Sequence, residues 1–242
     1  MTEEERRARE RIEKSRIRRE RQLRRNMIIC TGIVAIGLIS IVTLVLRLRG
    51  SKETLAEADD VSVTNEKYIA RQPELDVELL PVNPYSRPGT ELAEVKGIVV
   101  HYTANPGTTA MQNRDYFAGL AETHTTSASS HFIIGLEGEI VQCIPCSEIA
   151  YATKERNADT IAIECCIEDD TGKFNTKTYQ SLVELTTWLM GRYELGTDDV
   201  IRHYDVTGKN CPKYYVENGS AWRMFKSDLI EYIDKNGQEK EA

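Results

Sequence analysis

The chain has 242 residues, of which 40% are hydrophobic and 29% charged, and its formal net charge at pH 7 is −7. This length accommodates one sizeable domain with an added segment, and the composition excludes a chain that is disordered throughout. Residues 1–26 hold eleven Lys or Arg against six Glu, a net charge of +5, whereas residues 50–242 hold 18 basic and 32 acidic residues, a net charge of −14. Charge is therefore sharply partitioned along the sequence.

Residues 27–46, MIICTGIVAIGLISIVTLVL, form an uncharged and mostly apolar run. At about 1.5 Å per residue, a helix of this length spans the roughly 30 Å of hydrocarbon in a bilayer, so we predict one transmembrane helix. A cleavable signal peptide would have a shorter apolar run followed by small residues, whereas Arg47 and Arg49 follow here. A buried core helix of this length would need polar flanking positions, which the run lacks.

The basic segment at residues 1–26 predicts the orientation of this helix. Positive charge close to a membrane helix stays on the cytoplasmic side. We therefore expect a single-pass protein of the cell membrane, with a cytoplasmic N-terminus and an extracytoplasmic C-terminal part. Contact with anionic lipid headgroups is an alternative use of the basic residues. No nucleic-acid partner is expected, because the orientation rule already accounts for the charge.

Residues 47–74 are predicted to form an acidic tether, because most of this stretch is polar and only weakly periodic. A flexible chain of about 25 residues has an r.m.s. span of roughly 25–30 Å, which lets the domain act a short distance from the membrane. Four of the seven prolines lie between residues 73 and 88 and predict an extended strap leading into the fold. The folded domain is predicted at 75–234, followed by a polar tail at 235–242.

From residue 96 onward the pattern alternates between strands and helices. The expected elements are a strand at 95–103, a helix at 109–124, a hairpin at 130–144 turning at Glu137 and Gly138, a strand at 160–167, a helix at 179–195, a strand at 199–204, and a helix at 220–233 with Ser220 as N-cap. This order predicts a single α/β domain with a central mixed β-sheet flanked by helices. The sequence contains no internal repeat and no Gly-rich nucleotide loop.

Two of the four histidines, His101 and His203, each end a predicted apolar strand, at the edge where loops begin. Either one alone would more often be a structural hydrogen-bonding residue. Together with Cys211, they match the three protein ligands of a catalytic zinc site, in which a fourth position stays open. We therefore predict zinc at His101, His203 and Cys211.

The cysteines in CIPC at 143–146, together with the adjacent Cys165 and Cys166, raise the alternative of a structural zinc cluster. Adjacent cysteines have poor chelating geometry, and both stretches are predicted to lie in strands, which argues against it. A disulfide outside the cell and simple apolar packing both stay open for these residues, with packing favoured.

Hydrolysis at a zinc site also needs a carboxylate that takes a proton from water and a cation that meets the developing oxyanion. Glu164 is the predicted base, because burying a charge within the apolar strand TIAIECCI is costly unless it faces a polar cleft. A solvated strand face is the alternative for Glu164. Lys209 lies two residues before Cys211 and could reach a substrate carbonyl oxygen, with an ordinary surface lysine as the alternative.

Three motifs, IVVHYTANPG, SSHFIIGLEGEIVQCIP and IRHYDVTGKNCP, agree in order and spacing with a known family. The chain resembles the zinc-dependent N-acetylmuramoyl-L-alanine amidases of the peptidoglycan-recognition-protein superfamily, which includes the T7 phage lysozyme. The resemblance covers about residues 75–234. It implies hydrolysis of the amide between N-acetylmuramic acid and L-alanine in peptidoglycan. It also implies zinc bound by His101, His203 and Cys211, with Lys209 stabilising the oxyanion.

The sequence departs from the phage enzyme at Ser130, where that enzyme has a tyrosine that assists catalysis. Other members of the family use a glutamate in the strand before the long helix, which matches Glu164. The resemblance implies a structural role for His131 within the hairpin motif. His124 lies in a polar loop and is expected to be exposed, with a contact to substrate left open.

Tyr102, Thr103 and Asn105 follow the first predicted ligand and are expected to line the glycan or peptide groove, with loop packing as the alternative. Two rival functions stay open. One is a module that recognises peptidoglycan without cutting it, although such relatives generally lack the cysteine ligand. The other is a thiol hydrolase, whose nucleophile would open a helix, whereas Cys211 precedes Pro212 in a predicted loop. We infer no oligomeric state.

Overall fold

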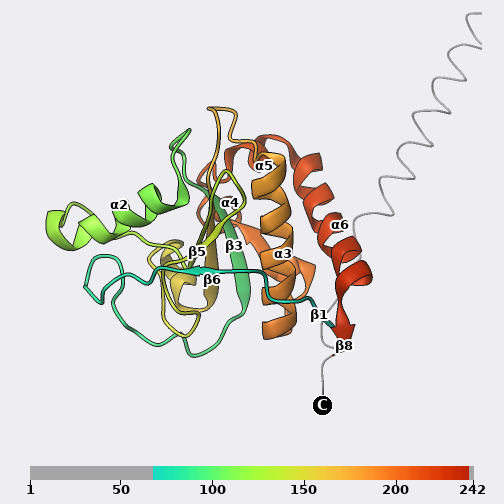
Figure 1. The fold of residues 1–242 in the computed structure, drawn as a ribbon, viewed down its shortest axis with the longest axis horizontal. Coiled ribbons are helices and arrows are strands. Elements are labelled where there is room, and N and C mark those ends of the chain that lie inside the picture. The colour runs from blue at the N-terminus through green and yellow to red at the C-terminus, as the bar shows by residue number, and fades with distance from the viewer. Residues whose placement is uncertain (1–67, 240–242) are drawn as a thin grey trace, which may run out of the picture. The chain divides into compact units, whose positions relative to one another are not determined.

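The computed structural model describes residues 68–239 (Figure 1). The basic segment at 1–26, the transmembrane helix predicted at 27–46 and the tether up to residue 67 lie outside the described residues. A search of the described residues for a helix long and apolar enough to cross a membrane found none.

The centre of the fold is a six-stranded sheet with the order β2-β5-β4-β6-β3-β7. Its strands are β2 (Asp76–Val77), β3 (Gly97–Tyr102), β4 (Phe132–Ile134), β5 (Ile140–Gln142), β6 (Thr160–Cys165) and β7 (Val200–Arg202). Strands β4 and β5 form an antiparallel hairpin, and the other neighbours pair in parallel, so the sheet is mixed as predicted. The apolar, β-branched strands are typical of a sheet covered on both faces.

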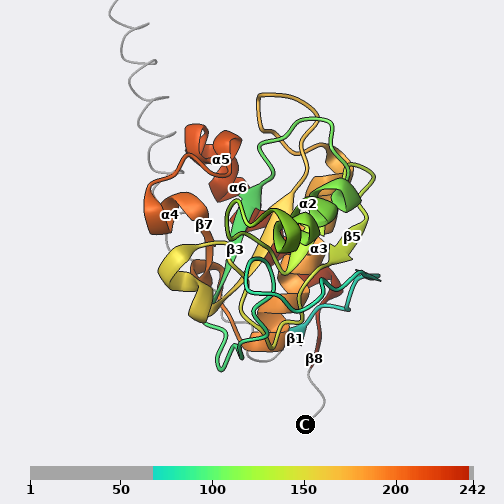
Figure 2. The ribbon, with the colours of Figure 1, turned by 90° about the vertical axis from the view of Figure 1, so that its left-hand side faces the viewer.

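Helices cover both faces of this sheet (Figures 1 and 2). The helical elements are α2 (Ala110–Thr123), η1 (Lys154–Ala158), α3 (Thr176–Tyr193), η2 (Thr197–Asp199), α4 (His203–Thr207), α5 (Lys213–Glu217) and α6 (Gly219–Asn236). The larger core joins α3 and α6 to one face of the sheet, and a smaller core joins α2 to the other. The predicted α/β domain with flanking helices is confirmed.

The alternation of side chains along β3 and β6 decides which face carries the polar residues. Ile98 and Val100 of β3, with Ile163 of β6, belong to the core beneath α3 and α6. Because successive side chains of a strand point to opposite faces, His101 and Glu164 lie on the other face. The two are direct partners in the parallel register of β3 and β6.

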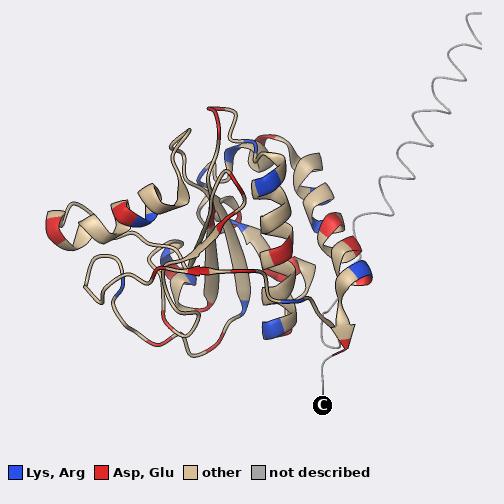
Figure 3. Ribbon diagram, in the orientation of Figure 1, with Lys and Arg blue, Asp and Glu red and all other residues tan. Residues whose placement is uncertain are grey.

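Charged residues lie mostly on helices and loops, whereas the central strands contain very few of them (Figure 3). Within β3, β4, β5 and β6, Glu164 is the one charged residue. A charged residue in this part of the sheet needs a polar partner, and Glu164 has one in His101, its neighbour in the register of β3 and β6.

The expected elements are all present, although most of their boundaries differ from the predicted ones by one to three residues. His203 does not end a strand: it is the first residue of α4, because Asp205 accepts a hydrogen bond from the backbone N–H of Arg202 at 2.8 Å and so starts a helix. Ser220 is not the N-cap of α6, since Asn218 closes α5 and opens α6 directly. Helix α3 begins at Thr176, three residues before the predicted start at 179.

The folded region also extends beyond the predicted limits of 75 and 234. Strand β1 (Tyr68–Ile69) pairs antiparallel with β8 (Gln238–Glu239), and Ile69 packs against the main core. The end of the tether predicted at 47–74 and the start of the tail predicted at 235–242 thus contribute to the fold. Two-residue strands carry too little pattern to be predicted from sequence.

We predict that Gly191, in the last turn of α3, is required for the packing of β1. A Cβ atom at this position would lie 2.7 Å from Cα of Ile69. Alanine usually stabilises a helix relative to glycine by about 0.5–1 kcal/mol, but here the clash reverses the sign. Gly191→Ala should lower the free energy of unfolding by about 1–3 kcal/mol, measured by urea denaturation of residues 62–242 through tryptophan fluorescence.

Gly119 in α2 is the matched control, because a Cβ there would meet no atom within 4 Å. Gly119→Ala should raise the free energy of unfolding by about 0.5–1 kcal/mol. An equal stabilisation by Gly191→Ala would contradict the packing of β1 on α3.

Candidate metal centre

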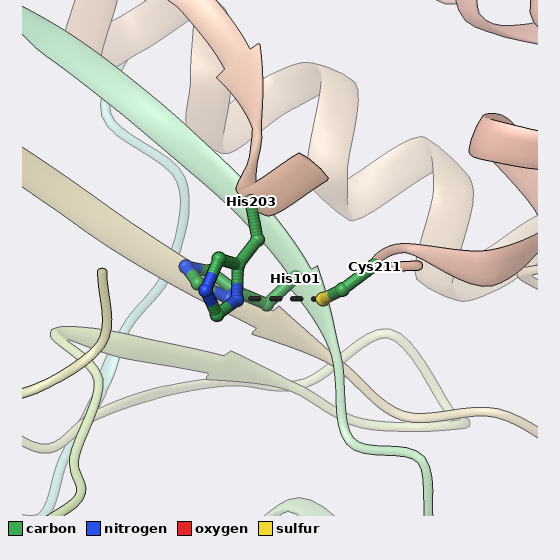
Figure 4. Close-up of side chains that lie close together, drawn as sticks. All are labelled: His101, His203 and Cys211. Atoms are coloured by element: carbon green, nitrogen blue, oxygen red, sulfur yellow. Dashed lines mark hydrogen bonds between the residues drawn. The ribbon is translucent and has the colours of Figure 1, made fainter. Parts of the chain in front are cut away.

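The three predicted metal ligands converge from three parts of the fold (Figure 4). His101 lies near the end of β3, His203 opens α4, and Cys211 lies between α4 and α5. All three are buried, and one ligand atom from each lies within 4.8 Å of the others. Sγ of Cys211 is 3.8 Å from Nδ1 of His101, and the centroids of the two imidazole rings are 4.7 Å apart.

A short segment brings Cys211 beside His203. Helix α4 ends at Thr207, and its C-cap residue, Gly208, has a left-handed conformation (φ 74°) that turns the chain back. The backbone N–H of Tyr204 then donates to the carbonyl oxygen of Cys211 at 3.0 Å. This bond closes the segment from residue 203 to residue 211, so that both side chains point to the same place.

The donor set and its surroundings fit zinc. Two imidazoles and a thiolate are ligands that zinc prefers, and Nδ1 of His203 is buried with no hydrogen-bond partner in the described part of the chain. Leaving such an atom unpaired costs about 1–3 kcal/mol, which a bond to a metal would avoid. A tetrahedral site with bonds of about 2.0–2.3 Å has ligand atoms roughly 3.3–3.7 Å apart. The observed cluster needs only a modest contraction to reach that geometry.

Burial keeps both histidines neutral, which is the form that binds a metal. Burial lowers the pKa of His101 well below its usual value, and the positive charge of Lys209, or of His203 when protonated, acts in the same direction. Burial also lowers the pKa of His203, helped by Lys209 and Lys154. Neutral imidazoles offer a lone pair without first having to release a proton.

Cys211 does not have the properties of a cysteine nucleophile. Burial, with the charge of Glu164, raises the pKa of its thiol to about 12, whereas nucleophilic cysteines have a lowered pKa. Helix α5 begins only at Lys213, so Cys211 does not open a helix. Both observations argue against the thiol-hydrolase alternative.

Glu164 faces the metal cluster and not a solvated strand face. Its Oε1 lies 3.9 Å from Nδ1 of His101, and its Oε2 is buried without a hydrogen-bond partner in the described residues. Burial raises the pKa of Glu164 to about 8, and the positive charge of Lys209 opposes this rise. A carboxyl group whose pKa lies near neutral pH is suited to accept and release a proton.

Lys209 is exposed and lines a cavity of about 570 Å³ that opens beside His203. The lining residues are Ser127, Tyr151, Ala152, Lys154, Asn157, His203, Thr207, Gly208 and Lys209. The lining contains two lysines and no Asp or Glu, although the outer part of the chain is acidic. The residues from 151 to 157 were missed by the sequence analysis, because they carry no motif.

The three predicted substrate-binding residues lie outside the wall of that cavity. The chain continues past β3 along β6, where the N–H of Thr103 donates to the carbonyl oxygen of Cys165 at 3.0 Å. Tyr102 is partly buried, Thr103 has a buried hydroxyl oxygen without a partner in the described region, and Asn105 is exposed. Contact of these residues with substrate stays a prediction.

His131 is structural, as predicted: its Nδ1 accepts from the N–H of Ala162 at 3.0 Å, and its Nε2 is 2.9 Å from the carbonyl oxygen of Glu148. His124 is exposed, also as predicted, and stacks on Tyr85 with ring centroids 4.2 Å apart. The hydroxyl group of Ser130 is buried and lies 2.9 Å from the backbone carbonyl oxygens of Phe132 and Ala162, so it does not replace the tyrosine of the phage enzyme.

The other cysteines of the described region form neither a disulfide nor a metal cluster. Cys143, Cys165 and Cys166 are buried in the two cores, which confirms apolar packing for them. The stretch CIPC was predicted to lie in a strand, and this prediction is wrong: β5 ends at Gln142 and the chain leaves the sheet at that point.

A sequence model of the N-acetylmuramoyl-L-alanine amidase family called Amidase_2 matches residues 91–214, just over half of the chain. The chain belongs to this family. The match includes all three members of the buried cluster, and in this amidase domain the cluster is consistent with the zinc site of the family.

Curated relatives and solved structures resemble the amidase domain over similar spans. N-acetylmuramoyl-L-alanine amidase CwlL of Bacillus licheniformis is 40% identical over 161 residues, covering 61% of this chain and 44% of the relative. BlyA of Bacillus subtilis (strain 168) is 36% identical over 169 residues, again 61% of this chain and 44% of the relative. The chain therefore spans less than half the length of these relatives. The catalytic domain of XlyA superposes with a TM-score of 0.54 at 25% identity, covering 64% of this chain and 99% of that structure.

We predict that Cys211 is required for zinc binding. The full chain should bind one zinc ion, and Cys211→Ala should lose at least about 100-fold in zinc affinity, because one of three protein bonds to the metal is removed. The measurement is competition with a chromophoric chelator. Cys143→Ala is the matched control, since Cys143 is equally buried but lies outside the cluster. Equal zinc affinity of the two variants would exclude Cys211 as a ligand.

Proposed function

We propose that the protein is a zinc-dependent hydrolase that cleaves the amide bond between N-acetylmuramic acid and L-alanine in peptidoglycan. The observation that carries this proposal is the buried cluster of His101, His203 and Cys211 beside Glu164, one of whose carboxylate oxygens has no hydrogen-bond partner in the described residues. Support comes from membership of the amidase family and from the names of the relatives that match this domain.

The residues around the cluster divide the chemistry between them. Zinc held by His101, His203 and Cys211 would supply Lewis acidity to water and to the substrate carbonyl group. Glu164 accepts the proton of the attacking water and returns it to the departing amine, because one of its carboxylate oxygens has no hydrogen-bond partner among the described residues. Lys209, on the cavity wall, provides positive charge for the developing oxyanion.

The cavity next to His203 is the side from which the substrate reaches this cluster. Its volume of about 570 Å³ is within the range of small-ligand sites, and its lysines give it a positive wall. Tyr102, Thr103 and Asn105 are proposed to contact parts of the glycan or peptide that extend beyond this cavity.

We also propose that this domain acts outside the cytoplasmic membrane, held there by a helix at residues 27–46. The support is the uncharged run of twenty residues and the positive charge of residues 1–26 before it. Peptidoglycan lies outside that membrane, so the proposed location agrees with the proposed substrate.

The first test of this function is the release of new L-alanine amino termini from purified peptidoglycan. Residues 62–242 should release them, a chelator should stop the release, and added zinc should restore it. Release that is insensitive to chelation would contradict a metal mechanism. Zinc binding without any release would instead favour a module that recognises peptidoglycan and does not cut it.

We predict that Glu164→Gln retains zinc and loses most activity. Glutamine keeps the size of the side chain but cannot take up a proton, so kcat should fall by at least about 100-fold. Zinc content, measured by atomic emission, should stay at the parent level. Glu168→Gln is the control, because Glu168 is exposed beyond the end of β6. A kcat for Glu164→Gln close to that of the control would remove Glu164 as the base.

A further inference from the structure

The imidazole of His101 has a second polar contact, made by the nitrogen that does not face Cys211. Its Nε2 lies 3.2 Å from Oγ1 of Thr153, while its Nδ1 faces the thiol of Cys211 and the carboxylate of Glu164. Thr153 is 0% exposed and His101 is 2% exposed, so water does not compete for this contact. The two ring nitrogens therefore have different partners in a dry environment.

The hydroxyl group of Thr153 is directed to the histidine and not to its own helix. Thr153 is the N-cap of η1, a position from which a threonine side chain usually accepts a hydrogen bond from the first turn. Here the side chain makes no such bond. The side chain of Thr153 therefore does not cap its own helix and instead contacts His101, 52 positions away in the sequence.

Asn157 fixes the backbone that carries Thr153. Its Oδ1 accepts hydrogen bonds from the N–H groups of Ala152 at 3.0 Å and Thr153 at 2.5 Å. The next residue, Lys154, adopts a left-handed conformation with φ 52°, which non-glycine residues rarely do. The loop is therefore held in a specific conformation that brings one hydroxyl group to the ring of His101.

We propose that Thr153 is a positioning residue for the metal centre. Its hydroxyl oxygen accepts a hydrogen bond from Nε2–H of His101, which fixes the tautomer with a free lone pair on Nδ1 and holds the ring toward Cys211. This inference rests on the proposed zinc site. Hydrogen bonds to the distal nitrogen of a histidine ligand orient the ring, and their loss typically costs 10–100-fold in metal affinity.

The test compares zinc dissociation constants of full-chain variants, measured by competition with a chromophoric chelator. Thr153→Val keeps the shape of the side chain but removes the hydroxyl, and should weaken zinc binding by about 10–100-fold. Thr153→Ser restores the hydroxyl and should bind within about threefold of the parent. Thr186→Val is the control: Thr186 is also 0% exposed, its hydroxyl has no hydrogen-bond partner in the described residues, and zinc binding should not change.

Zinc binding by folded Thr153→Val within about twofold of the parent would overturn the positioning role while leaving the proposed function intact. A parent chain that binds no zinc would overturn the proposed function, and this inference with it. If Thr153→Val does not fold, nitrogen-15 NMR of the zinc-loaded parent decides: a slowly exchanging proton on Nε2 of His101 supports the proposal, and a proton on Nδ1 overturns it.

Discussion

The in-register parallel pairing of β3 with β6 places His101 directly beside Glu164, on the face of the sheet opposite the main core. Both strands are otherwise apolar, so two polar side chains are held where burial is costly unless a partner satisfies them. Hydrogen bonds within the protein satisfy only some of the buried polar atoms at this site. One oxygen of Glu164 and one nitrogen of His203 have no hydrogen-bond partner in the described residues. A divalent cation coordinated by the histidines, with a substrate or water near the carboxylate, would complete the site.

Two short segments bring the other groups of the metal centre to this pair of strands. The segment from His203 to Cys211 is closed by the bond between Tyr204 and Cys211, and the loop from residue 151 to residue 157 reaches His101 through Thr153. Helices α3 and α6 hold the sheet from the opposite side. The rigid sheet thus sets the position of one ligand and of the proposed base, Glu164, while two short segments determine how the remaining groups approach them.

The strands, the long helices and the identity of the ligands could be predicted from the sequence, because they depend on local patterns. The mostly apolar runs that contain His101 and Glu164, and the spacing of His203 and Cys211, carry that information. Contacts made by loops could not be predicted: nothing in the residues around Thr153 indicates that its hydroxyl reaches a strand 52 positions away. The start of α4 at His203 was also missed, because the strand ends early where the backbone N–H of Arg202 donates a hydrogen bond to the carboxylate of Asp205.

The most direct test of this account is a crystal structure of the zinc-loaded domain, with anomalous scattering measured on both sides of the zinc absorption edge. The account predicts one zinc peak at about 2.0–2.3 Å from a nitrogen of His101, a nitrogen of His203 and Sγ of Cys211. The carboxylate of Glu164 should lie beside the metal without binding it. A zinc peak elsewhere, or a Cys211 side chain turned away from both rings, would contradict the account.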